Sequence, residues 1–283
     1  MFSPGTDREM MENSHSADNS PERNWKIKQV VYAEILNELH GHFVKMNVRY
    51  MPIKGAYLIC SGLAEKMKYR RMDDIDVCVG KDDFKKISDY FSGLPHVEVF
   101  LDDWDFEREF TYKTGSFECH LEIHSLLNYP ARFNLPFEKL FERALPAGEI
   151  RMLPCPEDAL IILLCHALVH IGFELRDTVF DEISFISNQQ GFSWEKFWVL
   201  AKPTGTEQFM CMLLLYYATD KSVEMNMPAL SLKTKLAGKF LSKNLHTRLP
   251  VLFRKLVLEI PFVRDPLWLI NQKISGKLKK PGK

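Results

Sequence analysis

The segment "DIDVCV", residues 74–79, constrains the fold more than any other part of the chain. Its Ile and Val side chains are typical of a buried strand, yet two aspartates interrupt them. Successive side chains of a strand point to opposite faces, so Asp74 and Asp76 share one face. Ile75 and Val77 share the other. The segment therefore predicts a sheet with one apolar face and a second face that carries carboxylates.

Strand and helix patterns alternate along the first half of the chain. Apolar residues recur at three- and four-residue steps over residues 25–46, which predicts an amphipathic helix. Strands are expected at residues 48–53, 74–79, 97–101, 108–112 and 117–124. Helices are expected at residues 55–66 and 81–92, the second with Asp82 as its N-cap. This interleaving predicts a mixed α/β (α+β) domain.

Helical periodicity dominates the second half. Pro156 and the two acidic residues after it form a strong helix-start signal. Helices are expected from there and at residues 178–188, 194–201 and 207–219, with proline-broken helical patterns over 230–280. The predicted organisation is a disordered tail at 1–23, an α/β domain at 24–150 and a helical domain at 151–283 that ends in a basic tail.

The overall composition excludes several classes of protein. The 37 basic and 37 acidic residues give a formal net charge of zero, so no global charge favours nucleic acid or a membrane surface. The six cysteines have no C-x-x-C spacing and lie mostly in apolar runs, which favours reduced core thiols and no structural zinc. No leader pattern or membrane-spanning run is seen, so a cytoplasmic protein is expected.

The two aspartates need a reason to share a buried strand. Neighbouring carboxylates repel each other and are costly to desolvate, and a divalent cation removes both penalties. Mg²⁺ is usually held by one or two carboxylates together with substrate phosphates. The alternative is a strand end at which Asp74 and Asp76 are solvated or cap a neighbouring element.

Basic residues near the aspartates favour a phosphate-binding site. Lys54 and Gly55 lie between a predicted strand and a predicted helix. A glycine there lets a phosphate approach the backbone, and the start of a helix favours an anion. Arg70 and Arg71 directly precede the acidic run and can pair with phosphate oxygens.

A third carboxylate lies on a later strand. In "CHLEIHSL", Glu122 shares a face with His120 and His124, and apolar residues form the opposite face. Such a strand can lie beside the one that carries the aspartates. Three carboxylates around two cations, Mg²⁺ or Mn²⁺, fit in-line phosphoryl or nucleotidyl transfer.

Four segments in this order carry a family resemblance: "IKGAYL", "RRMDDIDVCV", "LEIH" and "PEDALIILLCHALVHIGFELRDTVFDEI". Over roughly residues 25–200 the chain resembles the uncharacterised bacterial nucleotidyltransferase family, of the polymerase-beta-like superfamily. The resemblance implies a nucleotidyltransferase-like mixed sheet with flanking helices, followed by a helical substrate or acceptor domain. It also implies an NTP substrate.

The resemblance assigns roles residue by residue. It implies that Asp74 and Asp76 are metal ligands and that Glu122 is the third carboxylate. It places Lys54 and Gly55 at the phosphate loop, and Arg70 as the arginine before the motif. Two departures are present: Lys-Gly replaces the usual glycine–serine of the wider fold, and the third acid is Glu where many relatives have Asp.

For several histidines the sequence leaves more than one interpretation open. His166 and His170 are spaced i, i+4 and share a helix face, a spacing that can bind zinc, although no Glu follows the first histidine. They could instead pack between the two halves or line the substrate cleft. The resemblance favours the cleft, with Arg176 nearby. His124 either belongs to the site or makes a structural hydrogen bond.

These patterns predict a Mg²⁺-dependent nucleotidyltransferase that moves NMP from an NTP to a hydroxyl acceptor. The acceptor could be a small molecule, a sugar, a protein side chain or an RNA end. Asp74 and Asp76 would bridge the metals, Glu122 would help to activate the hydroxyl, and Lys54 and Arg70 would neutralise the triphosphate. The alternatives are a non-catalytic nucleotide- or RNA-binding regulator on the same fold, and a zinc hydrolase built on the two helical histidines.

Overall fold

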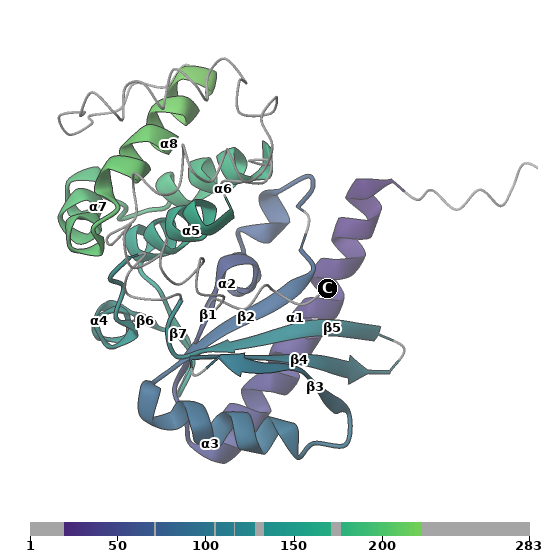
Figure 1. Ribbon diagram of the computed structural model, residues 1–283. Coiled ribbons are helices and arrows are strands. Elements are labelled where there is room, and N and C mark those ends of the chain that lie inside the picture. The colour runs from purple at the N-terminus through teal and green to yellow at the C-terminus, as the bar shows by residue number, and fades with distance from the viewer. Residues whose placement is uncertain are drawn as a thin grey trace, which may run out of the picture.

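The aspartate-bearing segment forms the second strand of a five-stranded mixed sheet in the computed structural model (Figure 1). The structure describes residues 20–70, 72–104, 106–115, 117–127, 133–170 and 177–221. The strands are β1 (Tyr50–Ile53), β2 (Asp74–Val79), β3 (Val97–Trp104), β4 (Glu107–Thr114) and β5 (Phe117–His124). Their order across the sheet is β1-β2-β5-β4-β3, and only β2 and β5 pair in parallel.

One face of the sheet is covered by α1 (Pro21–Met46) and α3 (Lys81–Ser92). Aromatic side chains pack α1 and α3 against each other and against the sheet. The ring centroids of Phe43 and Phe91 are 5.9 Å apart, and those of Phe91 and Phe110 are 6.0 Å apart. Phe43 also stacks on Tyr50 of β1 at 4.3 Å. All four rings are buried, so this face holds the main hydrophobic core.

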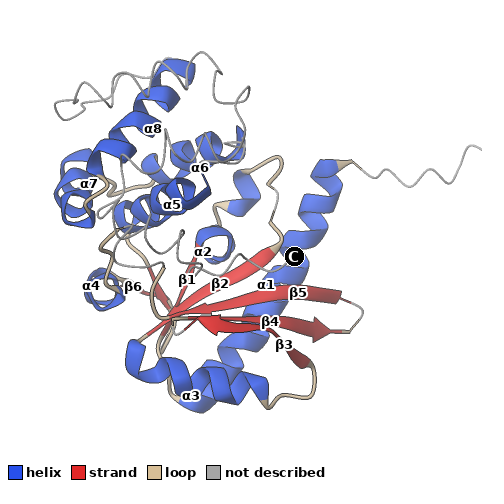
Figure 2. Cartoon of the chain, viewed as in Figure 1, coloured by secondary structure: helices blue, strands red, loops and turns tan. Residues whose placement is uncertain are grey.

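The opposite side of the sheet carries α2 (Lys54–Cys60) and then a helical layer (Figures 1 and 2). The layer contains α4 (Phe137–Arg143), α5 (Pro156–His170), α6 (Asp177–Ser187), α7 (Trp194–Ala201) and α8 (Glu207–Lys221). Helix α5 contacts α2, α6, α7 and α8, which explains its nearly continuous apolar sequence. A short two-stranded sheet, β6 (Leu145–Pro146) and β7 (Met152–Leu153), lies before α5.

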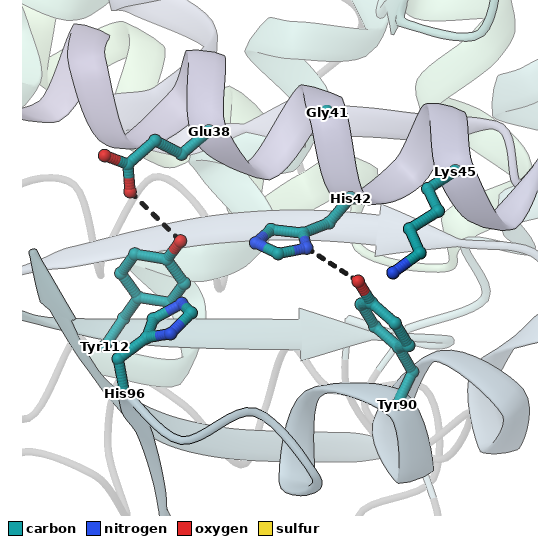
Figure 3. Close-up of a pocket in the computed structure, with 7 residues that line it drawn as sticks. All are labelled: Glu38, Gly41, His42, Lys45, Tyr90, His96 and Tyr112. Atoms are coloured by element: carbon teal, nitrogen blue, oxygen red, sulfur yellow. Dashed lines mark hydrogen bonds between the residues drawn. The ribbon is translucent and has the colours of Figure 1, made fainter.

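A hollow of about 500 Å³ lies on the α1 and α3 side of the sheet (Figure 3). Its lining consists of Glu38, Gly41, His42, Lys45, Tyr90, His96 and Tyr112. The polar groups bond to each other: His42 Nδ1 is 2.8 Å from the Tyr90 hydroxyl, and the Tyr112 hydroxyl donates to Glu38 at 3.1 Å. These pairs join the two helices to β4. The hollow lies on the face opposite to the aspartates.

The predicted fold class is confirmed, and the differences from the predicted boundaries have local causes. Helix α1 begins at Pro21 because the Ser20 hydroxyl accepts a hydrogen bond from the Arg23 amide and proline occupies the first turn. The helix predicted at 55–66 ends at Cys60, since Gly62 takes a positive φ of 72°, and a 3₁₀ turn, η1 (Ala64–Lys66), follows.

Other predictions were incomplete. Asp82 is not the N-cap of α3: the helix starts at Lys81 after Gly80, and Asp82 lies in its first turn. The strand predicted at 97–101 continues to Trp104, and α4, β6 and β7 were not predicted. Most of the predicted N-terminal tail and all of residues 222–283 lie outside the described residues.

Five of the six cysteines are buried free thiols, and Cys60 is partly exposed. Within the described part of the chain, no helix combines the length and the apolar character needed to span a membrane.

Two acidic residues of α5 are buried in its first turn. Asp158 is fully buried and accepts two hydrogen bonds of 2.8 Å from the Arg143 guanidinium of α4. Glu157 accepts from the Ser193 amide and from Lys196 at the start of α7. The negative charges of Glu157 and Asp158 also interact favourably with the positive N-terminal end of the α5 dipole. These contacts fix the helical layer to its connecting segments.

We expect Asp158→Asn to lower the free energy of unfolding by about 1–3 kcal/mol, because a buried charged hydrogen-bond partner is lost. Urea unfolding followed by circular dichroism measures the change. The control is Asp89→Asn in the exposed Lys85–Asp89 pair, which should change stability by no more than about 0.5 kcal/mol. Equal effects of the two substitutions would contradict a stabilising role for the buried pair.

Candidate functional site

The register of the central strands brings acidic residues together on one face of the sheet. Parallel pairing of β2 with β5 sets Asp74 beside His120 and Asp76 beside Glu122. Antiparallel pairing then sets Glu109 of β4 on the other side of Glu122. Two residues further along, Glu107 lies opposite His124. The carboxylates of this face that lie around the Asp76–Glu122 pair are Asp74, Asp76, Glu107, Glu109 and Glu122.

Asp76 is the centre of the cluster and is fully buried. Its Oδ1 atom accepts from Lys54 Nζ at 2.5 Å and lies 3.1 Å from His124 Nε2. Its Oδ2 atom is buried and has no hydrogen-bond partner among the described residues. A buried carboxylate oxygen with no partner is costly, so this oxygen is available to a further ligand.

Lys54 reaches the cluster from the first residue of α2, directly after β1. Its φ of 51° is a left-handed conformation that residues other than glycine seldom adopt. The ammonium also lies 3.6 Å from Glu122 Oε2. Burial alone would lower the pKa of Lys54, but the charges of Asp76 and Glu122 raise it above its ordinary value. Lys54 is therefore a buried cation held between two carboxylates.

His124 supplies a second positive charge. Its Nε2 atom lies 3.1 Å from Asp76 Oδ1 and 3.3 Å from Glu122 Oε2. Its Nδ1 atom lies 3.3 Å from Glu107 Oε2, an ion-pair distance whose alignment falls short of a hydrogen bond. Burial opposes the charge on the ring, yet the three carboxylates raise its pKa well above the ordinary value. The ring therefore bridges β2, β4 and β5.

The carboxylates differ in their pKa values according to their partners. Burial would raise the pKa of Glu122, but Lys54 and His124 lower it below the ordinary value. For Asp74, burial and the charge of Asp76 raise the pKa by more than Lys54 and Arg70 lower it. Burial together with Glu122 and Glu107 raises the pKa of Glu109 to about 7. Negative charge is thus concentrated at the centre of the cluster.

Arg70 and Gly55 lie together at the start of α2. Arg70 Nε donates to Glu182 Oε1 of α6 at 2.8 Å, and both side chains are largely buried. A Cβ atom on Gly55 would come within 2.6 Å of Arg70 Nη1 and 2.7 Å of Met72 Sδ. Glycine is required here because the guanidinium and the thioether occupy the space of a side chain. The arginine is thereby fixed above the residue that follows Lys54.

A family model described as "Uncharacterised nucleotidyltransferase" matches residues 21–219, well over half of the chain. The chain belongs to this nucleotidyltransferase family. No curated protein and no solved structure matches it. The sheet, the flanking helices and the helical layer are consistent with a nucleotidyltransferase-like fold.

The cluster of this family member fits a divalent cation. Ligand atoms of Asp76, Glu122 and His124 all lie within 4.8 Å of one another. Among the described residues, the buried Oδ2 of Asp76 has no hydrogen-bond partner. Carboxylate oxygens are the ligands that Mg²⁺ and Mn²⁺ prefer. Family and cluster together fit a metal-dependent nucleotidyltransferase.

The structure brings most of the sequence-predicted residues of the nucleotidyltransferase to one place. Asp74, Asp76 and Glu122 share one face of the sheet, Lys54 and His124 contact them, and Gly55 and Arg70 adjoin them. Arg71, Arg176 and the side chain of His170 lie outside the described residues. His166 is partly exposed on α5, and the zinc site proposed for it stays untested because the side chain of its partner is not described.

Three acidic residues of the site were not predicted. Glu107 and Glu109 alternate with Arg108 and Phe110, and the "KTGS" turn joins their strand to β5, so the hairpin pattern could have placed them beside Glu122. Glu182 carries no comparable signal, because it meets Arg70 only through the packing of α6.

Gly55→Ala should destabilise the nucleotidyltransferase by about 1–3 kcal/mol, since the new methyl group displaces the Arg70 guanidinium or Met72. The matched control is Gly41→Ala in α1, where a Cβ meets nothing within 4 Å. That substitution should stabilise the protein by about 0.5–1 kcal/mol, the usual cost of a mid-helix glycine. Urea unfolding measures both. A neutral Gly55→Ala protein would show that the close approach is not needed.

A pH dependence follows from Glu109. An unfolded glutamate releases its proton near pH 4.5, whereas folded Glu109 keeps it to about pH 7. Stability therefore falls as pH rises through this window, because the folded state binds more protons than the unfolded chain. Glu109→Gln should raise the melting temperature at pH 8, but not at pH 4.5, in a chelator-containing buffer. Glu118→Gln, at an exposed position of β5, is the control. An equal gain at both pH values would contradict the assignment.

Proposed function

We propose that the protein is a Mg²⁺- or Mn²⁺-dependent nucleotidyltransferase that moves NMP from an NTP to a hydroxyl acceptor. The observation that carries the proposal is the pairing of Asp76 with Glu122 across β2 and β5, with Asp74 on the same face. A chain has little reason to bury such a pair beside a lysine unless a charged ligand binds there. The family implies the NTP substrate.

Each residue has a proposed role. Asp74, Asp76 and Glu122 would hold the cation, which when bound supplies charge stabilisation for the triphosphate and the acceptor oxygen. Lys54 and Arg70 lie on the α2 side of the carboxylates and would neutralise phosphate oxygens. Gly55 would contribute by leaving room for the Arg70 guanidinium, since a Cβ there would come within 2.6 Å of Nη1. Arg71 and Arg176 lie outside the described residues, and their proposed phosphate and cleft roles are open to direct test.

The reaction itself needs one bond made and one broken. The acceptor oxygen forms a bond to the α-phosphorus, the bond from that phosphorus to the pyrophosphate oxygen breaks, and pyrophosphate leaves. The hydroxyl proton passes to a carboxylate of the cluster. The chain's contribution is to align the acceptor with the α-phosphorus and to neutralise the developing charge.

The helical region, residues 151–283, is the proposed acceptor-binding part. It reaches the site through α6, where Glu182 holds Arg70, and through Gln189, which donates to the Tyr57 hydroxyl of α2 at 2.8 Å. Acceptors in keeping with the chemistry are a small molecule, a sugar, a protein hydroxyl or an RNA end. His166 and His170 on α5 are proposed to face this cleft.

The test is transfer from each α-labelled NTP with Mg²⁺ or Mn²⁺, using a cell extract as the source of acceptors. Asp76→Asn should lower transfer at least about 100-fold, because a charged ligand is lost from the centre of the cluster. Circular dichroism should be unchanged. The matched control is Asp73→Asn: this neighbouring side chain is 51% exposed, pairs with Lys28 and should leave transfer intact.

The outcomes separate the candidate functions. Transfer by the wild type that the Asp76→Asn protein lacks supports the enzyme, and the labelled product reveals the acceptor class. NTP binding that depends on metal and on Asp76, with no transfer to any acceptor, would favour a nucleotide- or RNA-binding regulator on the same fold. Full activity of the Asp76→Asn protein would refute the site assignment.

A further inference from the structure

His124 lies against the carboxylates, although the proposed function gives it no role. It is the last residue of β5, and its side chain is 2% exposed. One ring nitrogen faces Glu107 at 3.3 Å, and the other faces Asp76 at 3.1 Å and Glu122 at 3.3 Å. A ring needed only to fill space would not bury two nitrogens among three carboxylates.

This arrangement has the form of a metal-binding histidine. Histidine ligands usually present one nitrogen to the metal and give the N–H of the other to a carboxylate, which fixes the tautomer and the ring orientation. Here Glu107 Oε2 lies 3.3 Å from Nδ1, close enough to orient the ring although the alignment falls short of a hydrogen bond, and Nε2 is directed at Asp76 and Glu122. Ligand atoms of His124, Asp76 and Glu122 also lie within 4.8 Å of one another.

We propose that His124 is a nitrogen ligand of the divalent cation, that Glu107 is its positioning residue, and that the resulting mixed site binds Mn²⁺ in preference to Mg²⁺. The inference rests on the proposed function only in requiring a divalent cation at the carboxylates. On binding, the cation takes the place of the Nε2 proton, which passes to solvent.

The metal preference follows from ligand chemistry. Mg²⁺ is a hard cation that favours oxygen ligands in nearly ideal octahedral geometry. Imidazole nitrogen suits transition metals better, and Mn²⁺ accepts both nitrogen and carboxylate ligands. Replacing one oxygen ligand by Nε2 therefore weakens Mg²⁺ binding more than Mn²⁺ binding. The ammonium of Lys54 beside Asp76 repels a bound cation, so a cation held by weak ligand bonds is disfavoured.

Electron spin-echo spectroscopy of Mn²⁺ bound to the full-length protein, without nucleotide, tests the ligation directly. A coordinated imidazole gives a ¹⁴N modulation, and protein made with ¹⁵N-labelled histidine should show its replacement by a ¹⁵N signal. This measurement needs no substitution and so does not depend on any variant folding. Absence of a histidine nitrogen signal from Mn²⁺ bound at the carboxylates would overturn the proposal.

Variants then identify the residue. His124→Gln should remove the nitrogen signal and raise the Mn²⁺ dissociation constant about 10- to 100-fold. It should raise the Mg²⁺ constant less, so that the Mn²⁺/Mg²⁺ preference falls. Glu107→Gln should keep the signal and weaken Mn²⁺ about 10-fold, as expected of a positioning residue. The control is His120→Gln, on the same face of β5 and opposite Asp74, which should keep both the signal and the preference. A signal that disappears with His120 instead would refute the assignment.

The metal measurement separates this inference from the proposed function. A protein that transfers nucleotide but shows no histidine nitrogen on Mn²⁺ would refute the inference alone. A protein that shows the nitrogen signal but transfers nothing would refute the proposed activity and leave the inference standing.

Discussion

The structure depends on one electrostatic constraint: Asp76 and Glu122 are direct neighbours on parallel strands, so two negative charges share a buried position. Coulomb repulsion between them would oppose the pairing of β2 with β5. Lys54 and His124 remove that repulsion from two sides, one from the end of β1 and one from the end of β5. The strand order is thus compatible with the charges only because these cations lie where they do.

A buried charged cluster stabilises a sheet poorly. Buried ion pairs often contribute little net stability, because each group must be removed from water. An apolar set of the same volume would serve the fold equally well. The other face of the same strands illustrates this, since Ile75, Val77, Leu121 and Ile123 are fully buried and carry no charge. The apolar face of these strands packs in the hydrophobic core, and the charged face carries the candidate site.

The sequence was sufficient for the local features of the site and insufficient for those created by distant packing. Alternation along "DIDVCV" and "LEIH" correctly predicted strands with acids on one face, because side-chain direction in a strand is a local property. Their mutual register is not local, so the contact of Asp76 with Glu122 needed the structure. Lys54 was expected near phosphate, yet its contact with Asp76 depends on an unusual backbone conformation that no sequence pattern announces.

The ion pair of Arg70 with Glu182 joins residues 112 positions apart in the sequence. Contacts of such long range form late, because the chain between them must be ordered first. The sheet, α2 and the carboxylates all lie within residues 20–124, whereas the partner of the arginine lies on α6 in the helical layer. The Arg70 side of the cluster is therefore complete only once the second half of the chain has been made. During synthesis, a chain whose second half is still emerging already contains the residues of the acidic face but lacks the glutamate that holds this arginine.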